Sequence, residues 1–346
     1  MGTVPSQLVE PWRRLRNNSF LKAFIRHDSV QRVRRNRIVE SLRARLGYAS
    51  WDYPADYIGS KSLTLRSQAQ VRGGDFASPE VAQLAWLDRP DWRDAVAKLS
   101  DPVRKAAAES FARDGFFVAE GLLDHSTVDE AFGAFLQGRT NGVVSGEGAD
   151  RRILNPHHHI PTLDSLFISN PRILEWLEFF FGRRPVTHQS TAGEYGTEIP
   201  AHTDAIHVSS YPTGFVIGAW IACEDIRLES GPIVYYPGSH RLPYILSGDV
   251  GIAEVERERC YEQYNERYFP KMRQVLLDSE ITGTPFLAKK GDVVFWHHNM
   301  MHSGAPITDP DATRKAVVCH YYAEGALRFH DLTGSRSAVW HLPKQH

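Results

Sequence analysis

The feature that most constrains the fold is a series of short strand-like runs that begins near residue 185. Segments such as FVIGAWIACEDI, GPIVYYPGSH, GDVVFWHHNMMHSG and KAVVCHYYAEG are apolar or alternating, and turn-forming residues separate them. Short strands at this spacing are typical of an all-β sandwich or barrel. We therefore predict a mainly β core in which strand ends and loops bring functional side chains together at a barrel mouth.

Helices are predicted to flank this core. The stretch DPVRKAAAESFARDGFFVAEGLL indicates a helix over 102–113, a stop at Gly115 and a strand over 116–120. The following stretch, DHSTVDEAFGAFLQG, indicates another helix, for which Asp124 or Ser126 supplies the cap.

The predicted main domain covers residues 101–346 and contains a charged helical insert near 249–280. Residues 1–100 are predicted to form a helical and irregular N-terminal extension. Its first 46 residues contain eleven Lys or Arg against three acids, with apolar positions at helical spacing. These arginines form either the solvated faces of two amphipathic helices, which is the simpler interpretation, or a docking surface for an anionic partner.

Charge and cysteine content narrow the class of protein. A formal net charge of -1 gives no overall reason to expect nucleic acid or a membrane as partner. The three cysteines, Cys223, Cys260 and Cys319, are odd in number and form no CxxC pair, which argues against a disulfide framework. No apolar run reaches the roughly 18 residues that span a bilayer. We predict a cytoplasmic protein without a membrane span.

The segment PAHTDAIH, residues 200–207, carries the first candidate for chemistry. In a strand, residues i and i+2 project from the same face, so His202 and Asp204 would direct an imidazole and a carboxylate to one point. This pair is either two ligands of a metal site or a polar turn at a strand end. A metal site requires a third ligand.

Three groups of histidines are candidates for that ligand: 157–159, the pair His297 and His298, and His302. His302 lies where an apolar strand meets a loop, which is where barrel mouths place ligands. The pair at 297 and 298 is better interpreted as hydrogen-bonded core or rim histidines. The triplet at 157–159 is better interpreted as a loop that contacts substrate.

Two histidines and one carboxylate on one side of a metal leave three coordination positions open, as in non-haem Fe(II) oxygenases. Twelve residues after His302, Arg314 opens the predicted strand RKAVVCHYY. A guanidinium pairs bidentately with a carboxylate, and the distal carboxylate of 2-oxoglutarate is a natural partner for it. The alternative is an ordinary surface arginine.

The order of these motifs resembles the phytanoyl-CoA dioxygenase family of Fe(II)- and 2-oxoglutarate-dependent oxygenases. The matching segments are the HTD run at 202–204, then GAWIACEDIRLESGPIVYYPGSH, KKGDVVFWHHNMMHSGAP and TRKAVVCHYY, with FARDGFFVAEGLLDHSTVDEAF before them. The resemblance covers about residues 105–325. It implies a double-stranded β-helix (jelly-roll) core with flanking helices.

The resemblance also implies roles for individual residues. His202, Asp204 and His302 match the iron ligands of the family, and Arg314 matches the residue that binds the C5 carboxylate of 2-oxoglutarate. Ser303 matches a position that hydrogen-bonds the same carboxylate. Trp220 is either an aromatic residue near the co-substrate or a plain core tryptophan.

The expected function is a dioxygenase that uses Fe(II), 2-oxoglutarate and O2, hydroxylates its substrate and releases succinate and CO2. The substrate is expected to be a small molecule, an acyl-CoA or a carrier-bound intermediate, contacted by His207, Tyr211, His157 and His159. The alternative is a jelly-roll protein that is inactive, or that holds another metal, and acts as a binding module, lyase or isomerase.

Overall fold

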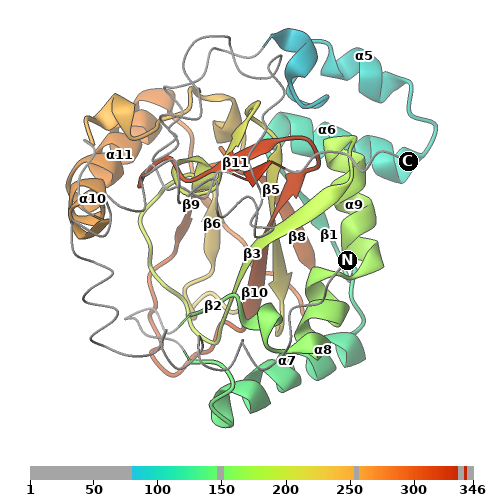
Figure 1. Ribbon diagram of the computed structural model, residues 1–346, viewed down its shortest axis with the longest axis vertical. Coiled ribbons are helices and arrows are strands. Elements are labelled where there is room, and N and C mark those ends of the chain that lie inside the picture. Colours follow the sequence, from blue (N-terminus) through green and yellow to red (C-terminus); the bar gives the residue numbers. More distant parts are fainter. Residues whose placement is uncertain (1–79, 146–151, 253–256, 334–338, 341–346) are drawn as a thin grey trace, which may run out of the picture. The chain divides into compact units, whose positions relative to one another are not determined.

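The computed structural model describes residues 80–145, 152–252, 257–333 and 339–340 (Figure 1). The basic helices predicted within the first 46 residues, and the anionic partner they suggested, lie outside the described residues. Within the described part, antiparallel sheets and flanking helices form the fold. The mainly β class predicted from the sequence is confirmed.

The largest sheet has six strands, each antiparallel to its neighbours. In spatial order they are β1 (Phe116–Ala119), β8 (Val293–His297), β5 (Val216–Ala222), β10 (Ala316–Ala323), β3 (Pro185–Gly193) and β2 (Ile153–Leu154). Two sheets of three short strands complete the β structure. One contains β7 (Thr284–Pro285), β6 (Ile233–Tyr235) and β9 (His302–Gly304), and the other contains β12 (Val339–Trp340), β11 (Leu327–Phe329) and β4 (Ser209–Tyr211).

The alternation of side chains gives the large sheet two different faces. On β5, Ile217, Ala219 and Ile221 pack into the hydrophobic core that the helices share. Trp220 and Ala222 point the other way, into a second hydrophobic cluster. Because side chains alternate with period two along a strand, β8 and β10 divide their residues in the same manner. One face is therefore covered by helices and the other is available for a site.

Helices α6 (Pro102–Asp114), α7 (His125–Thr140) and α9 (Pro171–Phe181) lie on one side of the large sheet (Figure 1). The Asp101 side chain accepts hydrogen bonds from the backbone N–H groups of Val103 and Arg104 and so caps α6. Such a cap contributes about 1 kcal/mol. Gly115, with φ of 86°, ends the helix in a left-handed conformation that glycine adopts without strain. Asp124 occupies the N-cap position of α7.

The charged segment between 249 and 280 contains α10 (Arg257–Gln263), the π-helical turn η9 (Tyr264–Tyr268) and α11 (Phe269–Ser279). These elements lie on the side of the sheets opposite α7 and α9 (Figure 1). Their apolar side chains pack against Ile206 and Met301, which belong to the loops around the candidate metal site. The insert therefore supports one wall of that site.

Shorter elements complete the described chain: η3 (Val81–Gln83), α5 (Trp92–Ala97), η4 (Pro156–His158), α8 (Pro161–Leu163), η5 (Asp164–Ile168), η7 (Ser239–Arg241) and η8 (Gly248–Val250). Ala85, Leu87, Trp92 and Val96 are buried in the main core, so the core includes residues before the domain start predicted at Asp101. Within the described residues, no helix has the length and apolar character required to cross a bilayer.

Candidate metal centre

The loop that carries His202 and Asp204 is fixed to the strand that carries His302. The backbone N–H of His202 donates to the carbonyl of His302 at 3.0 Å, and the N–H of His302 donates to the carbonyl of His202 at 2.9 Å. This is a single bridge and not the regular strand that the sequence suggested. Asp204 begins the 3-10 turn η6 (Asp204–Ile206). Tertiary contacts, more than strand periodicity, bring the two side chains together.

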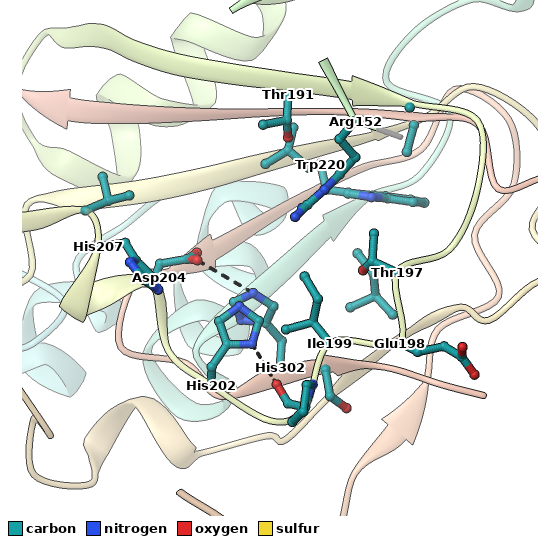
Figure 2. Close-up of a pocket in the computed structure, with 18 of the residues that line it drawn as sticks. Arg152, Thr191, Thr197, Glu198, Ile199, His202, Asp204, His207, Trp220 and His302 are labelled. Carbon is teal, nitrogen blue, oxygen red and sulfur yellow. Dashed lines mark hydrogen bonds and ion pairs between the residues drawn. The ribbon is translucent and has the colours of Figure 1, made fainter. Parts of the chain in front are cut away.

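The side chains of His202, Asp204 and His302 converge on one point (Figure 2). One ligand atom from each residue lies within 4.8 Å of the others, which is a spacing that a single metal ion can bridge. His302 Nε2 lies 3.7 Å from Asp204 Oδ1, and the two imidazole rings have centroids 4.4 Å apart. The structure therefore brings together the three ligands predicted from the sequence.

Hydrogen bonds to the backbone set which ring nitrogen of each histidine is available. Nδ1 of His202 donates to the carbonyl of Pro200 at 2.9 Å, and Nδ1 of His302 donates to the carbonyl of Met300 at 3.1 Å. Metal-binding histidines commonly donate their other N–H in this way. Burial and the neighbouring His302 lower the pKa of His202 to about 4. His202 is therefore neutral near pH 7 and presents Nε2 as a lone-pair donor.

Two buried donors hold the carboxylate of Asp204. Trp296 Nε1 donates to Asp204 Oδ2 at 2.8 Å, and His320 Nε2 donates to the same oxygen at 3.0 Å. Burial alone would raise the pKa of Asp204, but His302 and His320 outweigh it and hold this pKa well below its usual range. Asp204 is therefore ionised, with Oδ1 directed toward the histidines. The sequence analysis did not identify Trp296 or His320.

A cavity of about 660 Å³ opens beside the three ligands, and Arg314, Trp220, Ser303 and His207 all line it. Figure 2 shows Trp220 and Arg152 across the cavity from the histidines. The predicted co-substrate residues thus share one cavity with the predicted metal ligands.

Arg314 lies two residues before β10 and is 8 % exposed. Its Nη1 donates to the carbonyl of Gly231 at 2.8 Å, whereas its buried Nε has no hydrogen-bond partner. Burial, and to a smaller extent the nearby Arg152, lowers the pKa of Arg314 to about 10, so the guanidinium stays charged near pH 7. A buried cation in the wall of a cavity fits an anionic ligand.

Trp220 and Ser303 have different surroundings within the cavity wall. Trp220 is almost fully buried, and its ring lies edge-on to Phe286 with centroids 6.5 Å apart. It therefore contributes both to the hydrophobic cluster and to the cavity wall. Ser303 follows the ligand His302 on β9, and its Oγ lies 3.4 Å from the hydroxyl of Tyr236.

Of the four predicted substrate contacts, only His207 lines this cavity. Tyr211 is buried on β4, where it pairs with Leu327. His157 is buried against the hydroxyl of Ser190, and His159 is solvent-exposed. These three residues do not line this cavity, and a role for them in substrate contact stays a prediction.

The fold and the site together define a class of protein. Two histidines and one aspartate that converge from one side, in an antiparallel β core, form the 2-His-1-carboxylate arrangement. The family model for phytanoyl-CoA dioxygenase (PhyH) matches residues 111–316, and the chain belongs to this family. That match confirms the resemblance inferred from the sequence motifs.

Curated relatives match over part of their length. The peroxisomal phytanoyl-CoA dioxygenase of Rattus norvegicus is 27% identical over 158 residues, which are 44% of this chain and 43% of the relative. The phytanoyl-CoA dioxygenase domain-containing protein 1 of Mus musculus is 35% identical over 88 residues, 24% of this chain and 30% of the relative. The matched segments thus cover less than half of these relatives.

Solved structures show likeness in fold. The non-heme alpha ketoglutarate dependent carbocyclase SnoK from nogalamycin biosynthesis has a TM-score of 0.53 at 19% identity, with 72% of this chain and 90% of that chain covered. The epimerase SnoN from the same biosynthesis has a TM-score of 0.50 at 20% identity, with 66% and 86% covered. The predicted double-stranded β-helix core is confirmed by these comparisons.

Proposed function

We propose that this protein is an Fe(II)- and 2-oxoglutarate-dependent oxygenase that hydroxylates a small-molecule, acyl-CoA or carrier-bound substrate, with release of succinate and CO2. The observation that carries the proposal is one cavity lined by His202, Asp204 and His302 together with the buried cation of Arg314. Membership of the PhyH family supports it.

The three ligands fit Fe(II) by their chemistry. Two imidazole nitrogens and one carboxylate oxygen suit iron in the facial arrangement. The two backbone carbonyls that accept from Nδ1 keep each ring turned with Nε2 toward the common point. Among the described His, Cys, Asp and Glu residues, His202, Asp204 and His302 are the three whose ligand atoms lie close enough together to hold one metal ion.

The opposite part of the cavity fits the distal carboxylate of 2-oxoglutarate. The guanidinium of Arg314 is buried in the wall of the cavity, and a bound carboxylate would pair with its charge. Ser303, which lines the same cavity, offers a hydroxyl as a further donor. Trp220 supplies an apolar wall that excludes water beside the co-substrate. This arrangement supports the cofactor roles proposed for these three residues.

When bound together, iron and 2-oxoglutarate activate O2 and supply the oxidising power for attack on an unactivated C–H bond. The protein's own residues position and shield these groups. His202, Asp204 and His302 hold the metal on one side and leave the cavity side open. The buried indole and guanidinium of Trp220 and Arg314 keep bulk water away from the opposite end.

Substrate is proposed to approach between His207 and the helical insert. Tyr261, Tyr264 and Phe269 of that insert line the cavity together with His207. The rings of His207 and Tyr264 have centroids 4.9 Å apart, and burial lowers the pKa of His207 to about 3. A neutral imidazole among aromatic rings offers a hydrogen bond in an otherwise apolar wall. Such a wall suits a substrate that presents a hydrocarbon segment to the metal.

Two other functions remain as candidates. The similar structures are named as a carbocyclase and an epimerase, so the same fold serves other oxidative outcomes. A binding role, or lyase or isomerase chemistry with another metal, is the alternative from the sequence. The buried cation of Arg314 in the same cavity favours the 2-oxoglutarate-dependent reaction, because the distal carboxylate of 2-oxoglutarate requires such a partner. A cytoplasmic location stays a prediction, and one relative is named as peroxisomal.

The test is spectroscopic. Fe(II) and then 2-oxoglutarate are added to the purified protein without oxygen, and the visible metal-to-ligand charge-transfer band of the chelate is recorded. We expect the band in the wild type and its loss in His202→Ala. Absence of the band from folded wild-type protein, or an unchanged band in His202→Ala, would refute the site. Succinate receives one oxygen atom from ¹⁸O2 in each of these reactions, so incorporation of the other atom into the product formed from the substrate distinguishes hydroxylation from epimerisation or ring closure.

A further inference from the structure

Asp204 is held by two donors that meet at a single oxygen. Trp296 Nε1 and His320 Nε2 both donate to Oδ2, at 2.8 Å and 3.0 Å, and both side chains are buried. The other oxygen, Oδ1, is the one nearest to His302 Nε2, at 3.7 Å. The two oxygens of this carboxylate therefore have distinct surroundings.

The two donors belong to one row across three strands. Trp296 on β8 pairs with Gly218 on β5, and Gly218 pairs on its other side with His320 on β10. The planes of the indole and the imidazole are perpendicular, with ring centroids 6.0 Å apart. The sheet thus presents two N–H donors on the same face, one from β8 and one from β10, the strands on either side of β5.

Gly218 provides the room for this arrangement. A Cβ atom at position 218 would overlap the six-membered ring of Trp296. Any larger residue would displace the indole that donates to Asp204. The absence of a side chain at Gly218 therefore allows Trp296 to take the position from which it donates to Asp204.

We propose that Trp296 and His320 are positioning residues that occupy Asp204 Oδ2 and so restrict Asp204 to metal coordination through Oδ1 alone. This inference rests on the proposed function, since it concerns the same metal. A carboxylate can bind a metal through one oxygen or through both. With Oδ2 held by two hydrogen bonds, the aspartate uses one coordination position, and three remain for the chelating co-substrate and O2.

The first test compares Trp296→Phe with Trp86→Phe. Both changes remove a tryptophan N–H that donates a hydrogen bond, but the indole of Trp86 donates to the carbonyl of Phe179, outside the cavity. Co(II) replaces Fe(II) because it resists oxidation and because its visible absorption weakens as the coordination number rises. Affinity is measured by calorimetry and coordination by absorption.

We expect Trp296→Phe to bind Co(II) about 10- to 100-fold more weakly, which is the usual cost of losing a partner that orients a metal ligand. We also expect a changed Co(II) spectrum, whereas Trp86→Phe keeps the affinity and spectrum of the wild type. A folded Trp296→Phe protein with wild-type affinity and an unchanged spectrum would overturn the proposal. Equal changes in both variants would overturn it as well.

A second pair of variants keeps the test decisive if Trp296→Phe does not fold. His320→Gln retains an N–H donor, whereas His320→Leu has none. We expect His320→Gln to keep nearly the wild-type Co(II) affinity and spectrum. We expect His320→Leu to bind Co(II) more weakly and to show a changed spectrum. If the two variants behave alike, His320 does not position Asp204.

Failure of this inference is distinguishable from failure of the proposed function. The wild-type Fe(II) and 2-oxoglutarate band tests the function without reference to Trp296 or His320. If the wild type shows the band, the proposed function stands. If Trp296→Phe and His320→Leu then bind Co(II) as the wild type does, the positioning role is refuted.

Discussion

Two clusters of histidine and aspartate lie on opposite faces of strand β8 and its continuation. On the cavity face, Trp296 contacts Asp204 of the candidate metal centre. On the face toward α6, the next residue, His297, contacts Asp88, with Nε2 3.3 Å from Oδ2. His240 and His298 complete this second cluster, in which ring centroids are 5.6 and 5.0 Å from that of His297.

The two clusters differ in what the ring nitrogens contact. In the second cluster, His298 donates through Nδ1 to the carbonyl of Val208 at 3.1 Å, and its Nε2 accepts from the hydroxyl of Tyr244 at 3.0 Å. Both nitrogens of His298 are used within the protein, and Nδ1 of His297 accepts from the backbone N–H of Asn299 at 3.1 Å. In the metal centre, each histidine uses only Nδ1 in this way.

The difference shows that residue type alone does not make a metal site. Both clusters contain histidine and aspartate, and both are largely buried. The metal centre has its Nε2 atoms turned to a shared point beside a cavity, and the second cluster does not line that cavity. We infer that the first cluster serves chemistry, and that the second fastens residues near Asp88 and the loop at Val208 to the core.

Removal of the cation at the co-substrate end should produce the largest effect. Arg314→Ala deletes a buried guanidinium whose bound partner would be left unpaired, at a cost of about 2 kcal/mol or more. We expect 2-oxoglutarate to bind about 30-fold more weakly or worse, with Fe(II) affinity unchanged. Titration of the charge-transfer band measures the first quantity and calorimetry the second.

Arg314→Lys provides the matched control, since it keeps the charge and loses the planar fork. We expect it to recover only part of the 2-oxoglutarate affinity. Equal loss of Fe(II) and 2-oxoglutarate binding in Arg314→Ala would show that Arg314 supports the fold instead of the co-substrate.

A change in the second cluster should affect stability and leave metal binding intact. Asp88→Ala removes the carboxylate that contacts His297 and is expected to lower the free energy of unfolding by about 1–3 kcal/mol. Chemical denaturation measures this loss, and Fe(II) affinity at a temperature where the variant is folded checks specificity. Weakened Fe(II) binding in the folded variant would contradict the division of roles between the clusters.

The second cluster should also make stability depend on pH, with a smaller effect. Burial first, and then the neighbouring His297, lowers the folded-state pKa of both His240 and His298 to about 3. Their unfolded-state pKa is near 6.5, so the unfolded chain binds protons first as pH falls. Each group therefore lowers stability as pH drops below about 6.5, and the loss continues down to the folded-state pKa.

Between pH 7 and 5.5 the expected loss is about 1 kcal/mol for each of these groups. Burial, and then His297, lower the pKa of His298, and the charges of Asp88 and Asp204 raise it to a smaller extent than burial lowers it. The hydroxyl of Tyr244 donates to its Nε2. Denaturation of metal-free protein should therefore show a shallower pH dependence in His298→Gln than in the wild type. The same slope in both proteins would show that His298 is not held neutral.

Much of the architecture was predictable because it depends on local patterns. The stop at Gly115, the N-cap position at Asp124 and the alternation on β5 and β8 are visible in the sequence, and the structure contains them. The candidate ligands His202 and Asp204 were predictable in part from the HTD spacing, and His302 and the co-substrate candidate Arg314 from the resemblance to a family.

The partners of Asp204 were not predictable in the same way. Trp296 and His320 lie 92 and 116 residues away from it along the chain, and only the pairing of β8, β5 and β10 brings them together. A signal was present, since Trp296 and His320 share a period-two face with Val294 and Val318. A polar residue on such an otherwise apolar face indicates a buried hydrogen bond, but the sequence does not identify the residue that accepts it.

Tyr211 and the histidines at 157 and 159 show the opposite limit. These residues flank the candidate ligands or cluster in the sequence, but proximity along the chain does not determine whether a side chain lines the cavity. Tyr211 follows the metal loop by only a few residues, yet its pairing in β4 keeps it out of the cavity wall.

The most direct test of the central claim compares two histidines four residues apart. Fe(II) binding is measured by anaerobic equilibrium dialysis for the wild type, His302→Ala and His298→Gln, each confirmed as folded by circular dichroism. We predict one Fe(II) per chain in the wild type and in His298→Gln, and loss of this binding in His302→Ala. If His302→Ala retains Fe(II), or if a folded His298→Gln protein loses it, the assignment of His302 and not His298 as the metal ligand would be contradicted.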